Sequence, residues 1–293
     1  MYYKIDKIQN FNLAQTLECG QCFHFQKISE NAYEISAYGK ILTVEEKNDS
    51  IVFYDTTESE FHDIWEYYFD FKRDYSEIQN KILKSDPELC DIVGEYSGIH
   101  ILNQDFFETL ISFIISQNKQ IPQIKQVVRN ISEKFGSKSA DNIHLKSDYK
   151  CISDYQNLYI FPTIEQASHI TEDDFRACKA GFRAPYLIDA VKNVKDGKVT
   201  SDKISTLSNE DALKMLMTIK GVGEKVANCV MLFSCGRRDA FPVDVWMKRI
   251  MEKRYFHEDT PKEKIAEYGR EKYGEYAGYA QQYLFIYGKN NRV

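Results

Sequence analysis

The sequence lacks the features of a membrane or secreted protein. No apolar run approaches the roughly 20 residues that cross a bilayer, and the amino end, MYYKIDKIQNFNL, has neither the basic start nor the apolar centre of a signal peptide. The seven cysteines are an odd number and widely scattered, which is typical of reduced thiols rather than of a disulfide framework. We therefore expect an intracellular protein of the cytoplasm or nucleoid, with no membrane partner.

Metal-binding patterns are equally scarce. Cys19 and Cys22 form a lone C-x-x-C with no second pair and no nearby histidine ladder, so a structural role is favoured over a metal site. No cysteine follows Cys235, which leaves no set of four near the carboxyl end for an iron–sulfur cluster. We expect no cofactor and no metal held by side chains.

The net charge of −6 at pH 7 is unfavourable for nucleic-acid binding, because Lys and Arg neutralise phosphates. The charge is unevenly distributed, however. Residues 1–100 hold nine Lys or Arg against nineteen Asp or Glu, and residues 101–293 hold 29 against 25, giving −10 and +4. Because the local field decides DNA binding, the carboxyl-terminal part keeps that function open.

The sequence pattern predicts an α+β fold that is mainly α. Short β-branched or aromatic segments at 32–38, 40–46 and 50–55 are separated by turn residues and indicate an antiparallel sheet. Apolar residues at helical spacing dominate downstream. Helices are expected at 58–70, 104–116, 122–135, 185–195, 209–220, 224–234, 245–253, 261–273 and 276–287. We expect an amino-terminal sheet subdomain at 1–100 and a helical domain at 101–293, sharing a core if the two pack together.

The segment from Thr218 to Asp244, TIKGVGEKVANCVMLFSCGRRDAFPVD, carries most of the chemistry. Gly221 and Gly223 predict a tight turn between two helices, where the amides of the following helix can bind a phosphate. An ordinary helical hairpin explains the glycines equally well. Lys225, next to apolar residues, is either a nucleophile of lowered pKa or a surface lysine. Asp244, after Pro242, suits a helix N-cap, and it can also stabilise positive charge developing on a sugar.

At this point the chain resembles a known family. GVGEKVANC followed by FPVDVW is similar to the helix-hairpin-helix and Gly/Pro-Asp signature of base-excision DNA glycosylases (HhH-GPD), and most of all to the 8-oxoguanine DNA glycosylases. The resemblance extends to SGIHILNQDFFETLISFIISQNKQI, AGFRAPYL, EYAGYAQQYLF and, more weakly, CGQCFHF. It spans essentially the whole chain in the family's order. It implies a helical HhH-GPD domain that follows the sheet subdomain.

The resemblance implies a bifunctional glycosylase and AP lyase that excises 8-oxoguanine from double-stranded DNA. After base flipping, the hairpin lysine, here Lys225, attacks the anomeric carbon and forms a Schiff base, and β-elimination then cuts the strand. The matching aspartate, Asp244, would stabilise the oxocarbenium character. The hairpin's backbone carbonyls are a possible site for a monovalent cation. We expect a monomer, because one active site reads one flipped base.

Base recognition is also implied by the matching motifs. Cys229 and Phe285 would sandwich the flipped base, Gln281 would read its Watson–Crick edge, and the Gly20 carbonyl would accept the N7 hydrogen that guanine lacks. Without the resemblance, these residues would be interpreted as two core residues, a surface amide and a turn. The spacing supports one pair, because residues 281 and 285 share a helix face.

On the opposite strand, Asn118 and the pair Phe182-Arg183 match residues that fill the gap and read cytosine. Where animal enzymes carry a second cytosine-reading arginine, this chain has Gln123, so we expect a relaxed opposite-base preference. Trp246 stands where those enzymes place a histidine near the substrate phosphate.

The sequence alone does not decide between this function and two others. A glycosylase of the same superfamily can remove other oxidised bases or mispaired adenine, although many of those carry an iron–sulfur cluster and the adenine-removing branch typically lacks the lysine. A non-catalytic helix-hairpin-helix DNA-binding protein would use the hairpin alone and would need neither Lys225 nor Asp244.

Overall fold

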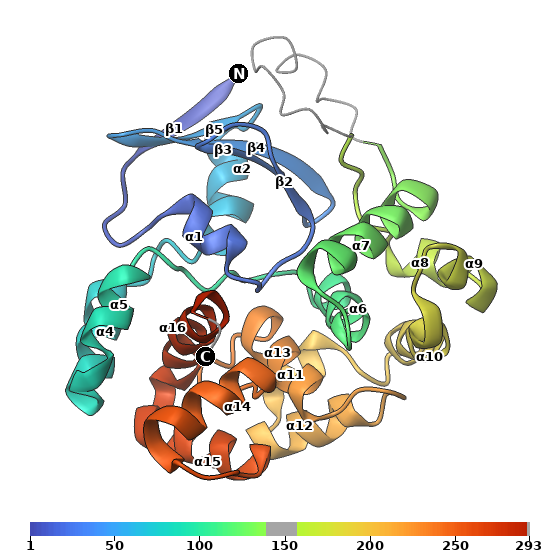
Figure 1. Ribbon diagram of the computed structural model, residues 1–293. Helices are drawn as coiled ribbons and strands as arrows, with labels where there is room; N and C mark the ends of the chain where they lie inside the picture. Colours follow the sequence, from blue (N-terminus) through green and yellow to red (C-terminus); the bar gives the residue numbers. More distant parts are fainter. Residues whose placement is uncertain (139–156, 292–293) are drawn as a thin grey trace.

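The computed structural model describes residues 1–138 and 157–291. A five-stranded antiparallel sheet lies at the top of the molecule in Figure 1, in the order β1-β5-β4-β3-β2. Its strands are β1 Tyr2–Asp6, β2 Phe25–Lys27, β3 Ala32–Ala37, β4 Lys40–Glu46 and β5 Ser50–Tyr54. The three predicted strands are confirmed as β3, β4 and β5. The pattern misses the two edge strands because β2 has three residues and β1 mixes charged with aromatic side chains.

Most of the remaining regular structure is α-helical. They are α1 Leu13–Glu18, α2 Glu58–Glu60, α3 Glu66–Tyr68, α4 Tyr75–Ser85, α5 Cys90–Glu95, α6 Phe106–Ser116, α7 Ile121–Phe135, α8 Ile164–Ala167, α9 Glu172–Ala177, α10 Ala184–Lys195, α11 Ser201–Thr206, α12 Asn209–Met217, α13 Glu224–Ser234, α14 Val245–Met251, α15 Lys262–Tyr273 and α16 Ala277–Asn290. A π-helical turn at Phe61–Trp65 joins α2 to α3 within the predicted helix 58–70. The α+β fold with a dominant helical part is therefore confirmed.

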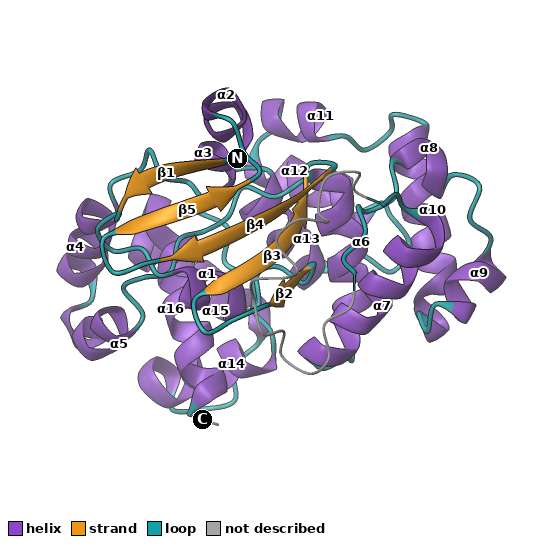
Figure 2. Cartoon of the chain, turned by 90° about the horizontal axis from the view of Figure 1, so that it is seen from above, coloured by secondary structure: helices purple, strands orange, loops and turns teal. Residues whose placement is uncertain are grey.

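Two hydrophobic cores underlie this arrangement. The sheet core packs Tyr33, Val44 and Phe53 against Trp65, and the register places Val44 opposite both Tyr33 and Phe53. The larger core joins the downstream helices and also takes the buried side chains of α4 and α5. Figures 1 and 2 agree that α1 lies between the sheet and α16. The amino-terminal helix α1 and the carboxyl-terminal helix α16 therefore lie close together in the middle of the molecule.

The segment 99–103, which joins the two cores, is held by buried polar groups. Arg238 donates to the Ile101 carbonyl at 3.2 Å and to Asn103 Oδ1 at 2.5 Å. The Leu102 amide donates to Gln21 Oε1 at 2.9 Å. Buried polar groups need such partners, so these bonds fix the sheet subdomain against the helices. No helix of the described residues is long and apolar enough to cross a membrane.

A second contact between early and late segments centres on Asp86, which is 3% exposed. Its Oδ2 accepts hydrogen bonds from the hydroxyls of Tyr255 at 2.6 Å and Tyr273 at 2.8 Å, and Lys272 Nζ lies 3.4 Å away. Burial by itself would raise the pKa of the Asp86 carboxyl. The two hydroxyls and the ammonium outweigh it and hold the pKa below its ordinary value.

We predict that Asp86→Ala lowers the free energy of unfolding at neutral pH by about 2–3 kcal/mol, because hydrogen bonds to a charged acceptor are lost. A lowered folded-state pKa gives stability that is fully present above the ordinary aspartate pKa of about 3.9 and is lost as the pH falls through the folded value. Denaturant unfolding of wild type and variant at neutral and acidic pH measures this difference, which should shrink in acid. A difference that is constant with pH would contradict the role assigned to the ionised carboxylate.

Candidate functional site

The predicted hairpin lies between α12 and α13. Gly221 has a φ of +79°, and a Cβ there would come within 2.3 Å of the Tyr186 ring, so no other residue fits. Gly223 is the N-cap of α13 and provides no side-chain hydrogen bond to the helix. The first amides of α13 therefore have no side-chain cap, and they carry the partial positive charge of a helix N-terminus. This end of α13 can bind an anion.

Lys225 lies in the first turn of α13, and its Nζ is 3.4 Å from Ser116 Oγ and 5.1 Å from the centroid of the Phe113 ring. Asp244 is the N-cap of α14, where its Oδ1 accepts from the Met247 amide at 2.8 Å. The predicted capping role is thus confirmed. Because only Oδ1 is used by the cap, the second carboxylate oxygen stays available to the pocket that both side chains line.

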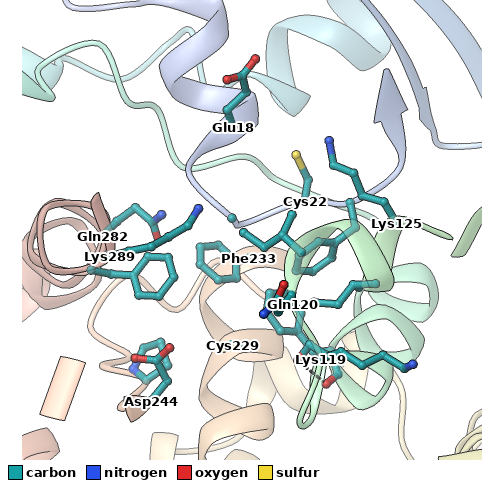
Figure 3. A pocket seen from close by; sticks show the side chains of 18 of the residues that line it. Glu18, Cys22, Lys119, Gln120, Lys125, Cys229, Phe233, Asp244, Gln282 and Lys289 are labelled. Carbon is teal, nitrogen blue, oxygen red and sulfur yellow. Dashed lines mark hydrogen bonds between the residues drawn. The ribbon is translucent and has the colours of Figure 1, made fainter. Parts of the chain in front are cut away.

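That pocket has a volume of about 690 Å³ and is bounded by segments from both ends of the chain. Seven of the site residues predicted from the sequence line it, namely Gly20, Lys225, Cys229, Asp244, Trp246, Gln281 and Phe285. Figure 3 shows Glu18 and Cys22 on the amino-terminal segment above the pocket, Asp244 below it, and Gln282 and Lys289 on α16. The fold therefore brings together side chains that are more than 250 residues apart in the sequence.

The walls of the pocket suit a flat ring with hydrogen-bond donors. Gly20 has a φ of +90°, and a Cβ there would lie 3.2 Å from the Phe285 ring. Gln281 is 4% exposed, and its Oε1 is buried without a hydrogen-bond partner among the described residues. A buried amide oxygen without a partner is costly, so a ligand N–H would satisfy it. Cys229 is buried in the wall, and burial, only partly offset by Lys225, raises the pKa of its thiol to about 11.

The electrostatics of the pocket contrast with the acidic chain. Its lining includes five lysines and two carboxylates, namely Lys27, Lys119, Lys125, Lys225 and Lys289 with Glu18 and Asp244. Burial lowers the pKa of Lys125 to about 8, and it lowers the pKa of Lys289 as well. The Lys125 ammonium lies 3.3 Å from the centroid of the Phe25 ring, a favourable cation–π contact. A basic pocket of this kind suits the phosphates of a nucleic acid.

Sequence reasoning did not identify Lys125, Lys289 or Gln282 as site residues. Gln282 is 2% exposed, and its Nε2 donates to the Cys19 carbonyl at 3.0 Å. Only Lys289 had a signal in the sequence, because it lies four residues after Phe285, just as Phe285 lies four residues after Gln281. The other two depend on contacts between segments far apart in the chain, and these have no local pattern.

The residues expected at the opposite strand lie outside the pocket. Asn118 is exposed with a φ of +52°, and the Phe182 ring is 53% exposed. Arg183 is only 4% exposed. Its Nε donates to the Gln117 carbonyl at 2.7 Å and its Nη1 to the Ala180 carbonyl at 3.1 Å. The guanidinium is therefore turned inward and holds the end of α6.

The Gln123 side chain is also engaged in a contact within the protein. Its Oε1 accepts from the Gln120 amide at 3.2 Å in a capping box at the start of α7. In this structure, neither side chain is free to make a bidentate, charge-assisted contact with a base. The Arg183 guanidinium is bound to backbone carbonyls, and Gln123 is neutral and occupied in the capping box.

The two cysteines of the lone C-x-x-C are not joined by a disulfide. Cys19 belongs to the helical core and Cys22 to the sheet core, and both are free and buried. Across residues 1–138 and 157–291, no cluster of three or more His, Cys, Asp or Glu side chains is placed to hold a metal ion.

Comparison with known proteins places this geometry in a family. Residues 4–110 match the family model of the 8-oxoguanine DNA glycosylase N-terminal domain, and residues 111–275 match that of the HhH-GPD superfamily base excision DNA repair proteins. The N-glycosylase/DNA lyase OGG1 of Arabidopsis thaliana is 31% identical over 223 residues, covering 72% of this chain and 58% of that protein. The chain thus spans a little over half the length of this curated relative.

Two solved structures resemble the fold over nearly their full length. The structure of MBOgg1 in complex with a low-affinity DNA ligand has a TM-score of 0.91 and 38% identity, covering 100% of this chain and 96% of that one. The 8-oxoguanine glycosylase/lyase of Clostridium acetobutylicum, solved with double-stranded DNA containing cytosine opposite 8-oxoG, has a TM-score of 0.90 and 39% identity, covering 99% of both chains.

We predict that the Cys229 thiol resists alkylation. With a pKa near 11 and little exposure, it should react with iodoacetamide at about pH 7.5 at least about tenfold more slowly than the exposed Cys90, since the thiolate is the nucleophile. Peptide mass spectrometry over time measures both rates, and Cys90→Ser identifies the fast site. Equal rates would mean that the Lys225 ammonium outweighs burial and keeps the thiol ionised.

Proposed function

The chain belongs to the 8-oxoguanine DNA glycosylases of the HhH-GPD superfamily, and we propose that it excises 8-oxoguanine from duplex DNA and then cleaves the abasic strand. The observation that carries this proposal is the content of the pocket. Lys225 and Asp244 line it together with Cys229, Phe285 and Gln281, whose Oε1 has no hydrogen-bond partner among the described residues. One chain supplies every group, so we propose a monomer acting on double-stranded DNA that contains 8-oxoguanine.

The chemistry follows from an amine and a carboxylate at one sugar. As the C1′–N9 bond breaks, the base leaves with the electron pair and takes up a proton, and positive charge develops on the sugar. Asp244, fixed by its cap bond, stabilises that charge. The Lys225 Nζ then bonds to C1′ and loses a proton, and opening of the sugar ring gives a Schiff base. Loss of a C2′ proton and departure of the 3′ phosphate complete β-elimination and cut the strand.

Discrimination against guanine would rest on one hydrogen atom. 8-Oxoguanine has an N7–H where guanine has a lone pair, so the Gly20 carbonyl accepts from the first and repels the second. Gln281 Oε1 would accept from the Watson–Crick edge, while Cys229 and Phe285 stack on the two faces of the base. A site built to pair every polar group strongly rejects an analogue that leaves one unpaired. A DNA-binding protein that clamps phosphates alone would need none of these groups.

We also propose a relaxed preference for the base opposite the lesion. Bidentate, charge-assisted contacts from arginine are the strongest readers of a base edge. Here Gln123 is neutral and occupied in a capping box, and the Arg183 guanidinium is bound to backbone carbonyls. Phe182 and Asn118, both exposed, can still fill the gap in the helix without distinguishing the base.

We predict that borohydride traps a covalent adduct between the wild-type protein and a duplex containing 8-oxoguanine. Lys225→Gln should abolish the adduct and lower excision at least about a thousandfold, because the nucleophile is removed. Lys214→Gln is the matched control, since Lys214 is exposed and paired with Glu210 on α12. An undiminished adduct in Lys225→Gln would exclude this lysine as the nucleophile, and no adduct in wild type would exclude the proposed reaction.

The opposite-base proposal predicts similar excision rates with C, A, G or T across from 8-oxoguanine, within about tenfold. Gln123→Arg should steepen the preference for cytosine by about tenfold or more, the range of one good bidentate contact. Gln126→Arg adds the same charge one turn further along the exposed face of α7, and it should raise all four rates alike. A steep cytosine preference in wild type, unchanged by Gln123→Arg, would overturn the argument.

A further inference from the structure

We propose that Gln282 is a positioning residue that aims the Gly20 carbonyl at the flipped base and so sets how effectively 8-oxoguanine is recognised. This inference rests on the proposed function. It assigns to the second amide of the Gln281-Gln282 pair a role distinct from that of the first. Gln281 faces the base, and Gln282 orients the loop that faces it from the other side.

The contact is short, buried and placed one peptide before the recognition carbonyl. Gln282 Nε2 donates to the Cys19 carbonyl at 3.0 Å, and both residues are almost fully buried, at 2% and 1% exposure. Gln282 projects from α16, the helix that also carries Gln281 and Phe285. Figure 3 shows it beside Lys289 at the wall of the pocket. The bond therefore ties the loop to the same helix that reads the other edges of the base.

Gly20 needs such an anchor because glycine is the least restrained residue of a chain. Its φ of +90° is a conformation that other residues rarely adopt, and nothing in its own side chain selects it. Peptide planes are rigid, so the direction of the Gly20 carbonyl depends on the two dihedrals between the peptide planes before and after it. Fixing both neighbouring residues fixes that direction.

The following residue is anchored independently. Gln21 is fully buried, and its Nε2 donates to the Thr16 and His100 carbonyls, each at 2.8 Å, while its Oε1 accepts from the Leu102 amide at 2.9 Å. These bonds hold the loop to its own subdomain. Gln282 is the bond that sets the loop against α16, and so it fixes the distance between the Gly20 carbonyl and the Gln281 oxygen across the ring.

The test separates base recognition from sugar chemistry. Gln282→Met keeps the length of the side chain and removes the donor. Excision is measured on a duplex containing 8-oxoguanine, and strand cleavage is measured on the same duplex with a preformed abasic site, which has no base to recognise. The ratio of excision to abasic-site cleavage should fall about ten- to a hundredfold, the factor for the loss of one buried hydrogen bond. Gln282→Asn, too short to reach Cys19, should lower the ratio similarly.

Gln79→Met is the matched control. Gln79 Nε2 also donates to a backbone carbonyl, that of Ser97 at 2.9 Å, and it contacts the Tyr283 hydroxyl of α16 at 3.2 Å. It lies outside the residues that line the pocket, so its loss should leave the ratio at the wild-type value.

Each outcome decides between the claims. A lowered ratio in both Gln282 variants but not in Gln79→Met supports the positioning role. An unchanged ratio, including one in which both activities fall together, overturns it and leaves Gln282 as a structural residue. A wild-type protein that cleaves abasic sites without excising 8-oxoguanine would instead overturn the proposed function.

Discussion

The pocket depends on one constraint, the contact between the amino-terminal loop at Gly20 and the carboxyl-terminal helix α16. The loop at Gly20 packs so closely on Phe285 that an added Cβ would lie 3.2 Å from the ring, and the Gln282 amide bonds the neighbouring Cys19 carbonyl. Asp86 makes a second contact between early and late segments, because it joins the end of α4 to α15. Lys225 and Asp244, at the starts of α13 and α14, line the pocket that this closure bounds. The sheet subdomain therefore forms one wall of the pocket.

The pocket combines charged groups with neutral polar groups, and both kinds suit the proposed reaction. The lysines around the pocket oppose a net charge of −6 for the whole chain, so attraction to DNA is local. In the proposed complex, neutral acceptors would face the base while the amine and carboxylate would face the sugar. On the opposite-strand side, the Arg183 guanidinium holds the Gln117 carbonyl, so the groups that could read a partner base serve the fold. As proposed, the same chain would be selective for the lesion and permissive toward the base opposite it.

Local features of this protein could be predicted from the sequence, and distant contacts could not. The helix Glu224–Ser234 has the predicted bounds, and Asp244 caps α14 as expected, because glycine turns and caps are encoded within a few residues. β2 was missed because three residues show little period, and β1 because it mixes charged with aromatic side chains. The inward turn of Arg183 and the bond from Gln282 to Cys19 depend on carbonyls 66 and 263 residues away. Such partners are set by the tertiary fold, and motif resemblance names the residues without giving these contacts.

The central claim is that one pocket, closed by both ends of the chain, holds the flipped base. A crystal structure of the Lys225→Gln variant with a duplex containing 8-oxoguanine tests it most directly, because the complex cannot react. The account predicts the base between Cys229 and Phe285, with the Gly20 carbonyl and Gln281 Oε1 each within hydrogen-bond distance of a base N–H. A base that stays stacked in the duplex, or that enters the pocket with the Gly20 carbonyl turned away from N7, would contradict it.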